Sequence, residues 1–162
     1  MKTGVVVGTF DLFHIGHLNL LNRARLECDR LIVGVNRDAV VLRDKNVETS
    51  IKEDDRLEII KSLYVVDDAF LVDDNAVQFI RDTLAKGIPL NCYFRGAEPE
   101  KLHILVENEK IRAMGVDVVQ FPYTDRVSST LLRCKLVKKS DSSVTLNCEL
   151  KKEAGIDDKT EN

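Results

Sequence analysis

The chain has 162 residues, 44% of them hydrophobic, which is enough for one α/β domain and too few for two ordinary domains. Its formal net charge of -3 argues against a protein that coats nucleic acid, because such surfaces depend on an excess of Lys and Arg. No apolar run is long enough to span a bilayer or to form a signal peptide, so we expect a cytoplasmic protein with no membrane partner.

Short apolar runs alternate with segments of helical periodicity along most of the chain. The runs, each of which predicts a buried strand, are Gly4–Val7, Leu31–Val35, Ala69–Val72, Leu90–Phe94 and Val116–Phe121. Helices are predicted between them by apolar pairs at helical spacing, such as Leu18 and Leu21, Leu57 and Ile60, Val77 and Ile80, and Leu102 and Leu105. This alternation predicts a parallel five-stranded sheet with helices on both faces, and binding loops at the carboxyl ends of the strands.

Two segments interrupt the alternation. Residues 37–52 are polar and charged without a sustained period, which indicates a mobile flap. The chain after Leu136 is again mostly polar, although Val144–Leu150 alternates briefly and could form a short edge strand. We therefore expect one domain over residues 1–136 and a disordered tail over residues 137–162.

The sequence GTFDLFHIGH follows the first predicted strand directly. It places Gly8 and Thr9 at a turn, and His14, Gly16 and His17 at the start of the next helix. Backbone N–H groups at a helix N-terminus are unpaired and attract anions, and glycines allow a phosphate to approach closely. Two imidazoles three residues apart can donate hydrogen bonds to the oxygens of one phosphorus. The motif therefore predicts a phosphate site in which the histidines stabilise charge.

This histidine pair differs from an isolated histidine such as His103, which is more often an ordinary core or surface residue. No metal site is predicted, because no third ligand has a matching spacing and the four cysteines form no C-x-x-C pair. The phosphate-binding patterns G-x-x-x-x-G-K-[ST] and G-x-G-x-x-G are absent. The H-x-G-H pair is thus the main chemical signal in the sequence.

At these residues the chain resembles the cytidylyltransferase-like nucleotidyltransferase superfamily, whose H-x-G-H signature is His14 to His17 here. The resemblance is strongest to glycerol-3-phosphate cytidylyltransferases and extends over roughly residues 1–135. It is carried by GTFDLFHIGHLNLLNRA, by EDDRLEIIKSLYVVDDAFLVDD and by VSSTLLR. It implies a Rossmann-like fold, in-line attack of a substrate phosphate on the α-phosphorus, Mg²⁺-assisted release of pyrophosphate, and a homodimer.

The resemblance also assigns roles to residues of the first motif. Thr9, Phe10, His14 and His17 would surround the α-phosphate of the nucleotide. Asp11 would orient the loop or interact with cationic partners. Gly8 and Gly16 complete the predicted nucleotide-binding set of this motif.

A second motif follows the last predicted strand, where family enzymes hold the triphosphate with R-T-x-G-I-S-T-T. The positions that match its outline are Thr124, Val127, Ser128, Ser129 and Thr130. Tyr123 stands where the family has arginine, and Arg126 stands where it has glycine, so we expect Arg126 to supply the guanidinium. Because Ser and Thr also favour helix N-caps, simple capping is the alternative reading of this segment.

Further cationic groups are expected near the triphosphate, since its charge must be neutralised as pyrophosphate leaves. Arg43 and Lys45 in the polar flap and Arg56 at the start of the next helix lie where the resemblance implies cationic phosphate ligands. We choose Lys45 over Arg43 and predict Lys45 and Arg56 as substrate ligands, although any of the three could be a solvated surface charge. Arg95-Gly96 replaces the M-G-D-D-like turn of the cytidylyltransferases and looks like a turn of phosphopantetheine adenylyltransferases. Arg95 is therefore a predicted nucleotide ligand, and ATP is a close second to CTP.

The sequence thus predicts a nucleotidyltransferase that moves a nucleoside monophosphate, CMP first, from a triphosphate to a small phosphomonoester such as glycerol 3-phosphate. An adenylyltransferase that uses ATP with a phosphopantetheine-like or sugar-phosphate acceptor is the first alternative. A non-catalytic nucleotide-binding regulatory protein is the second. The intact histidine pair argues for an enzyme.

Overall fold

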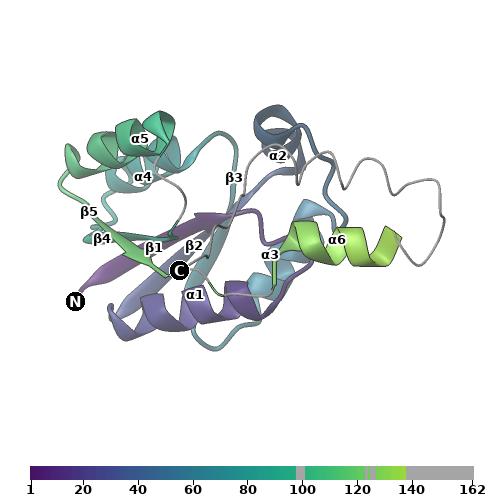
Figure 1. The fold of residues 1–162 in the computed structure, drawn as a ribbon. Helices are drawn as coiled ribbons and strands as arrows, with labels where there is room; N and C mark the ends of the chain where they lie inside the picture. Colours follow the sequence, from purple (N-terminus) through teal and green to yellow (C-terminus); the bar gives the residue numbers. More distant parts are fainter. Residues whose placement is uncertain (98–100, 123, 125–126, 138–162) are drawn as a thin grey trace, which may run out of the picture. The chain divides into compact units, whose positions relative to one another are not determined.

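The computed structural model describes residues 1–97, 101–122, 124 and 127–137 (Figure 1). The chain divides into two compact units, Met1–Arg126 and Val127–Asn162. The first unit contains the sheet and most of the helices, and the described part of the second unit contains helix α6, Ser129–Val137. The predicted domain boundary after residue 136 and the disordered tail stay predictions, because residues 138–162 lie outside the described part of the chain.

The first unit is built on five parallel strands in the order β3-β2-β1-β4-β5. Their bounds are β1 Thr3–Gly8, β2 Arg30–Asn36, β3 Asp68–Val72, β4 Cys92–Gly96 and β5 Asp117–Phe121. The predicted parallel five-stranded sheet with helices on both faces is confirmed. The bounds differ most at β4, which begins two residues later than expected and includes Arg95 and Gly96, which the sequence placed in a turn.

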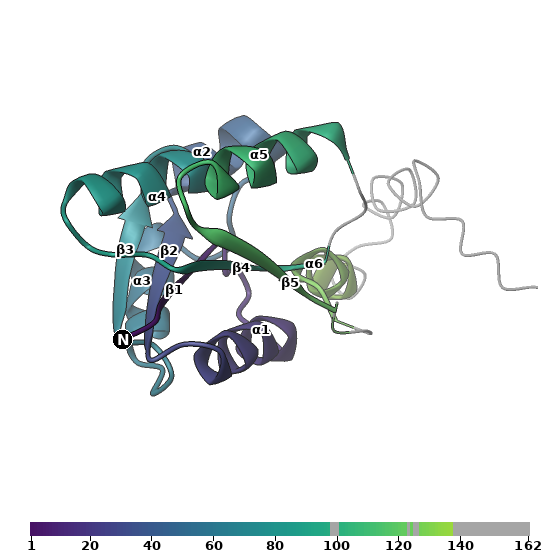
Figure 2. The same ribbon diagram turned by 90° about the vertical axis from the view of Figure 1, so that its left-hand side faces the viewer.

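Helices cover the sheet on both sides, as Figure 2 shows. The helices α1, Ile15–Leu26, and α3, Glu53–Lys61, pack on one face, and α4, Ala76–Ala85, and α5, Leu102–Arg112, pack on the other. Successive side chains of a strand point to opposite faces, so each strand contributes to two cores. In β1, for example, Val6 packs against Leu21 of α1, whereas Val5 belongs to the core around Ile80 of α4.

The segment that the sequence assigned to a flap contains a helix, α2, Asp38–Lys45. Its sequence DAVVLRDK has one apolar run, Ala39–Leu42, of which Val40 and Val41 are buried and the other two residues are exposed. A single short apolar run shows no helical period, which explains why the pattern missed an eight-residue helix. The Glu53 carboxylate accepts from the Asp38 N–H at 2.7 Å, and so pairs an N–H at the start of α2.

In the described part of the chain, no helix has both the length and the apolar character needed to cross a membrane.

Candidate active site

The loop after β1 lies where the order of the sheet reverses. The chain moves from β1 to β2 and β3 on one side, and β4 and β5 lie on the other side of β1. In open α/β sheets the carboxyl ends of the strands at such a point form the ligand crevice. The loop from Thr9 to His14 follows the carboxyl end of β1, so the first motif stands at this crevice.

His14 is the N-cap of α1, with extended backbone angles of φ -143° and ψ 172°. Its Nδ1 atom accepts a hydrogen bond from the Gly16 N–H at 3.1 Å. In the neutral ring the proton is therefore on Nε2, which makes that atom a hydrogen-bond donor. The Gly16 N–H, which we expected to bind a phosphate, instead donates to the His14 ring. The Nε2–H group of that ring is then the donor available to a phosphate.

His17 lies against His14 with the two rings stacked, at a centroid distance of 3.8 Å and an interplanar angle of 18°. Burial lowers the pKa of His17 to about 4, with further contributions from His14 and Lys45 that the Asp11 carboxylate opposes. Burial also lowers the pKa of His14. Two charged rings at this separation would repel by about 4 kcal/mol at an effective dielectric constant of about 20. Near neutral pH the pair is therefore uncharged and offers N–H donors.

Lys45 brings a positive charge to the same loop. It is the last residue of α2, and its Nζ atom donates to Thr9 Oγ1 at 3.1 Å. The positive charge of Lys45 also contributes to the lowered pKa of His17. The structure thus brings together Thr9, His14, His17 and Lys45, which the sequence predicted from two separate segments.

The backbone of the loop is held in an unfavourable conformation around Asp11. Phe10 and Leu12 have φ angles of 55° and 47°, in the left-handed region that L-residues rarely adopt. A Cβ atom at Gly8 would lie 3.1 Å from the Phe10 ring, so this glycine makes room for Phe10. The ring is buried and contacts His17 edge to face at 5.4 Å. Such a strained backbone persists only when contacts with the surrounding structure hold it in place, which is common at functional sites.

Asp11 provides some of the contacts that hold the loop in this conformation. Its carboxylate is 1% exposed and accepts hydrogen bonds from the N–H groups of Ser50 and Ile51, both at 2.9 Å. These bonds join the strained loop to the segment between α2 and α3. Of the two roles that the sequence allowed for Asp11, the structure shows the orientation of the loop.

Arg56 differs from its prediction as a substrate ligand. Its side chain is fully buried, and its guanidinium donates to the carbonyl oxygens of Ile51 and Thr9 and to the Asp38 carboxylate. A cation with these three acceptors is directed at protein groups and not at a ligand. Arg56 therefore holds the backbone carbonyl of Thr9, while Lys45 contacts the Thr9 side chain.

Asp38 completes this buried arrangement. Burial opposes ionisation, but hydrogen bonds from Thr49 and Arg56, both at 2.7 Å, lower the pKa of its carboxyl. The negative charge compensates the buried guanidinium, as a buried cation requires. Asp38, Thr49, Ser50 and Ile51 were not predicted, since their partners lie up to 40 residues away and no local pattern marks them.

Arg95 also lies elsewhere than expected. It is 9% exposed and donates to Glu107 and Asn108 of α5, at 3.2 and 3.1 Å. Its guanidinium stands 5.9 Å from the ring of Tyr93, which belongs to the core under α4 and α5. Because α1 covers the opposite face, the Arg95 side chain is directed away from the histidine pair. Its predicted contact with the nucleotide would require leaving α5.

The second motif is only partly described. Thr124 lies in the first unit and accepts a hydrogen bond from Asn19 Nδ2 of α1 at 3.4 Å. Ser128 caps α6, because its hydroxyl oxygen accepts from the Leu131 N–H at 3.1 Å, which agrees with the capping alternative. Ser129 begins α6, Thr130 is exposed and Val127 precedes the cap. Arg126 and Tyr123 lie outside the described residues, so the nucleotide roles of this motif stay predictions.

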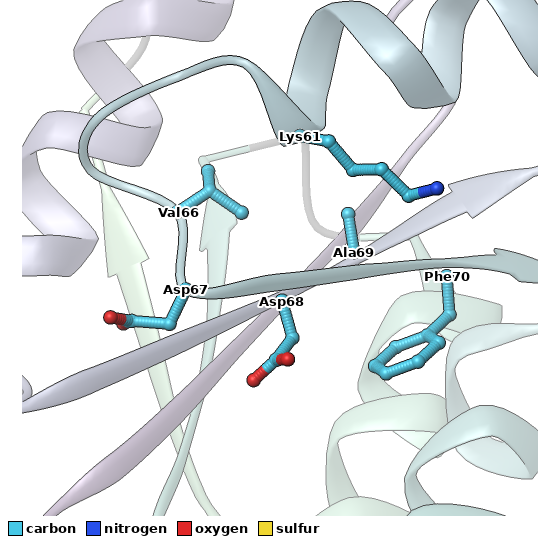
Figure 3. A pocket seen from close by; sticks show the side chains of 6 residues that line it. All are labelled: Lys61, Val66, Asp67, Asp68, Ala69 and Phe70. Carbon is cyan, nitrogen blue, oxygen red and sulfur yellow. The ribbon is translucent and has the colours of Figure 1, made fainter.

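A cavity of about 330 Å³ lies elsewhere on the first unit, at the amino end of β3 (Figure 3). It is lined by Lys61, Val66, Asp67, Asp68, Ala69 and Phe70. The strands are parallel, so their amino ends meet at the edge opposite the β1–α1 loop. This cavity is therefore separate from the crevice. Within the described ranges, no group of three His, Cys, Asp or Glu residues could hold a metal ion.

The comparison with known families agrees with the geometry of the crevice. The model of the cytidylyltransferase-like family matches residues 5–135, which include β2 to β5, most of β1 and both motifs. The chain belongs to this family. It is therefore a member of a nucleotidyltransferase superfamily, and the histidine pair occupies the crevice of a nucleotidyltransferase fold.

Within this cytidylyltransferase-like family, several curated relatives are bifunctional proteins named HldE. That of Granulibacter bethesdensis is 46% identical over 119 residues, covering 71% of this chain and 23% of the relative. That of Nitrobacter hamburgensis is 32% identical over 133 residues, covering 82% of this chain and 26% of the relative. The chain thus spans about a quarter of the length of these relatives.

Solved structures share the fold at lower identity. The lipopolysaccharide core biosynthesis protein of Thermoplasma volcanium has a TM-score of 0.61 at 24% identity and covers 78% of this chain and 99% of its own. Thermotoga maritima TmcAL, bound with α-thio ATP, has a TM-score of 0.63 at 16% identity and covers 86% of this chain and 51% of its own. At these identities the likeness establishes the fold alone.

Proposed function

We propose that this chain transfers a nucleoside monophosphate from a nucleoside triphosphate to a phosphorylated small molecule and releases pyrophosphate. The observation that carries the proposal is the stacked pair His14 and His17 at the N-terminus of α1, beside Lys45 and Thr9. A neutral pair of N–H donors next to one ammonium group suits a phosphate group, because its oxygens accept hydrogen bonds and carry the negative charge that develops in the reaction. The family supports the same class of reaction.

In this proposal an oxygen of the acceptor phosphate attacks the α-phosphorus of the nucleotide. The bond from that phosphorus to the oxygen bridging the β-phosphate breaks, and pyrophosphate leaves with the electron pair. His14 and His17 donate hydrogen bonds to the α-phosphate oxygens and stabilise the charge that develops there. The anionic oxygens would raise both imidazole pKa values, because a nearby negative charge favours the protonated ring. No protein nucleophile is required.

Mg²⁺ belongs to the proposal as a companion of the triphosphate. Mg²⁺ is commonly bound through one or two carboxylates together with substrate phosphates. The Asp11 carboxylate is poorly suited to this role, since it is 1% exposed and already accepts from two backbone N–H groups. The cation would therefore enter bound to the nucleotide and neutralise the leaving pyrophosphate.

ATP is the donor that we favour, and a sugar phosphate is the acceptor class. The TmcAL structure holds α-thio ATP, and a structure of the Francisella tularensis pantoate–β-alanine ligase, with a TM-score of 0.54, holds a β-γ ATP ligand. The Thermoplasma relative is named for lipopolysaccharide core biosynthesis, which supports a sugar-derived acceptor over glycerol 3-phosphate. CTP is the second candidate donor, because the family is described as cytidylyltransferase-like. A homodimer and a cytoplasmic location stay predictions.

The test is a pyrophosphate-release screen that crosses ATP, CTP, UTP and GTP with sugar phosphates, glycerol 3-phosphate and phosphopantetheine. We expect release with ATP and at least one sugar phosphate, and little release when the acceptor is omitted. Release with CTP and glycerol 3-phosphate alone would reverse the choice of substrates but keep the reaction. Nucleotide binding without release for any acceptor would support the non-catalytic alternative.

A further inference from the structure

Two side chains on one face of α1 contact the segment that leads to the second motif. Arg23 Nη1 donates to the carbonyl oxygen of Pro122 at 2.9 Å, and Asn19 Nδ2 donates to Thr124 Oγ1 at 3.4 Å. Asn19 and Arg23 are four residues apart, so they lie on the same side of the helix. Their partners are about 100 residues away along the chain. The helix that begins at the histidine pair is therefore also the attachment point of this distant segment.

Helix geometry places the attachment near the start of α1. Side chains of a helix lean toward its N-terminus, so a residue covers the turn that precedes it. Asn19 is three residues after Gly16, which has no side chain to fill that turn. The Thr124 hydroxyl, bound to Asn19, therefore stands beside the first turn of α1, the end of the helix where His14 is the N-cap.

The polarity of the contact defines what the hydroxyl can do. An amide NH₂ group only donates, so Thr124 Oγ1 is the acceptor and its own proton is left to donate elsewhere. A phosphate oxygen at the N-terminus of α1 is an acceptor of the right kind. We infer that Asn19 and Arg23 are positioning residues, which hold Thr124 against α1 so that its hydroxyl donates to a phosphate of the bound triphosphate. This inference rests on the proposed function.

The first arm of the test is a double-mutant cycle on nucleotide binding, with Asn19→Ala, Thr124→Val and the double variant. Calorimetry with the α,β-methylene analogues of ATP and CTP measures binding without an acceptor. We expect each single variant to raise the Kd about threefold to tenfold, the range of one hydrogen bond. The Kd of the double variant should be no higher than that of the single variant with the higher Kd, because Asn19 acts through Thr124.

The second arm reverses the polarity of the contact. Asn19→Asp can only accept, so it would turn the Thr124 proton toward residue 19, and we expect a larger loss of affinity than for Asn19→Ala. Asn22→Asp is the control, since it adds the same charge at an exposed position of the same helix and should bind as the wild type does. Arg23→Met should weaken binding, and Arg23→Lys, which can still donate to the Pro122 carbonyl, should recover part of the loss.

The outcomes separate the two proposals. If the wild-type chain binds neither analogue, the proposed function fails, and this inference fails with it. If the wild type binds but Asn19→Ala and Arg23→Met bind equally well, the inference alone is wrong. Additive effects of Asn19→Ala and Thr124→Val would also overturn it, because they would show that Asn19 does not act through Thr124. Thermal unfolding of each variant checks that the fold is intact.

Discussion

The two motifs of this chain are held in different ways. In the first motif, Thr9 is bound by Arg56 and Lys45, and Asp11 by the N–H groups of Ser50 and Ile51, so the segment from α2 to α3 holds the strained loop at two residues. At the second motif, Thr124 and the nearby Pro122 accept hydrogen bonds from two α1 side chains, Asn19 and Arg23. The first loop is thus held in part by the buried Asp11 and Arg56, whereas the two contacts of α1 with the second segment are part-buried and exposed.

Removing the buried cation should break the first motif most severely. Arg56→Met would leave the Asp38 carboxylate without its guanidinium partner and release the Thr9 carbonyl. We expect the free energy of unfolding to fall by about 3–5 kcal/mol, the usual range for breaking a buried ion pair. Urea unfolding measures this change. Arg43→Met is the matched control, since Arg43 is half exposed and its loss should change the free energy of unfolding far less. Equal effects would refute the structural role of Arg56.

The histidine pair should affect turnover and leave stability nearly unchanged. His17→Ala is expected to lower turnover at least about a hundredfold, because it removes one donor to the charge that develops at the α-phosphorus. His14→Ala should behave similarly. Steady-state pyrophosphate release with the best substrate pair measures the loss, and His103→Ala, at an exposed position of α5, is the control. Wild-type turnover in either variant would show that the corresponding ring has no part in the reaction.

The buried position of His17 also predicts how stability depends on pH. Its pKa is about 4 in the folded chain and 6.5 as a model value, so between these values only the unfolded chain binds the proton. The contribution of His17 to the free energy of unfolding is therefore fully present above pH 6.5 and decreases as the pH falls toward 4. At pH 4.5 the wild type should lose about 2–3 kcal/mol more than His17→Gln, relative to pH 7.5. Parallel urea curves for the two proteins at both pH values would contradict this burial.

The smallest expected effect concerns the second motif. Ser128→Ala removes the N-cap of α6 and should destabilise that helix by about 1 kcal/mol. Asn75→Ala removes the matching cap of α4, where the Asn75 side chain accepts from the Gln78 N–H at 3.0 Å. Hydrogen exchange should show faster exchange within α6 for the first variant and within α4 for the second. Unchanged exchange in α6 would mean that Ser128 does not cap this helix in solution.

The sequence was most informative where the signal is local. Short apolar runs such as Leu31–Val35 predicted the strands, because a buried strand needs only a few consecutive apolar residues. His14 and His17 were recognisable because their spacing and their place after β1 are both visible in ten residues. The family resemblance also predicted Lys45 in the polar flap, and in the structure its ammonium group donates to Thr9.

The rest depended on contacts between distant segments. Arg56 looks like a surface arginine in the sequence, and only the fold brings Asp38 and the Thr9 carbonyl to it. Arg95 was assigned to a turn near the nucleotide, but β4 continues through Arg95 and Gly96. The Arg95 side chain therefore lies on the face of the sheet that α5 covers. Asn19 and Arg23 are ordinary polar residues of an amphipathic helix until Pro122 and Thr124 are placed beside them.

The central claim is that the α-phosphorus of a nucleotide reacts beside His14 and His17. The most direct measurement follows two labels in one reaction, one at the α-phosphorus and one at the γ-phosphorus of the triphosphate, with a sugar phosphate as acceptor. The account predicts that the α-label appears in the nucleoside-diphospho product and the γ-label in pyrophosphate, and that both transfers fall together in His14→Ala and His17→Ala. Transfer of the γ-label to the acceptor, or α-label transfer that survives both substitutions, would contradict it.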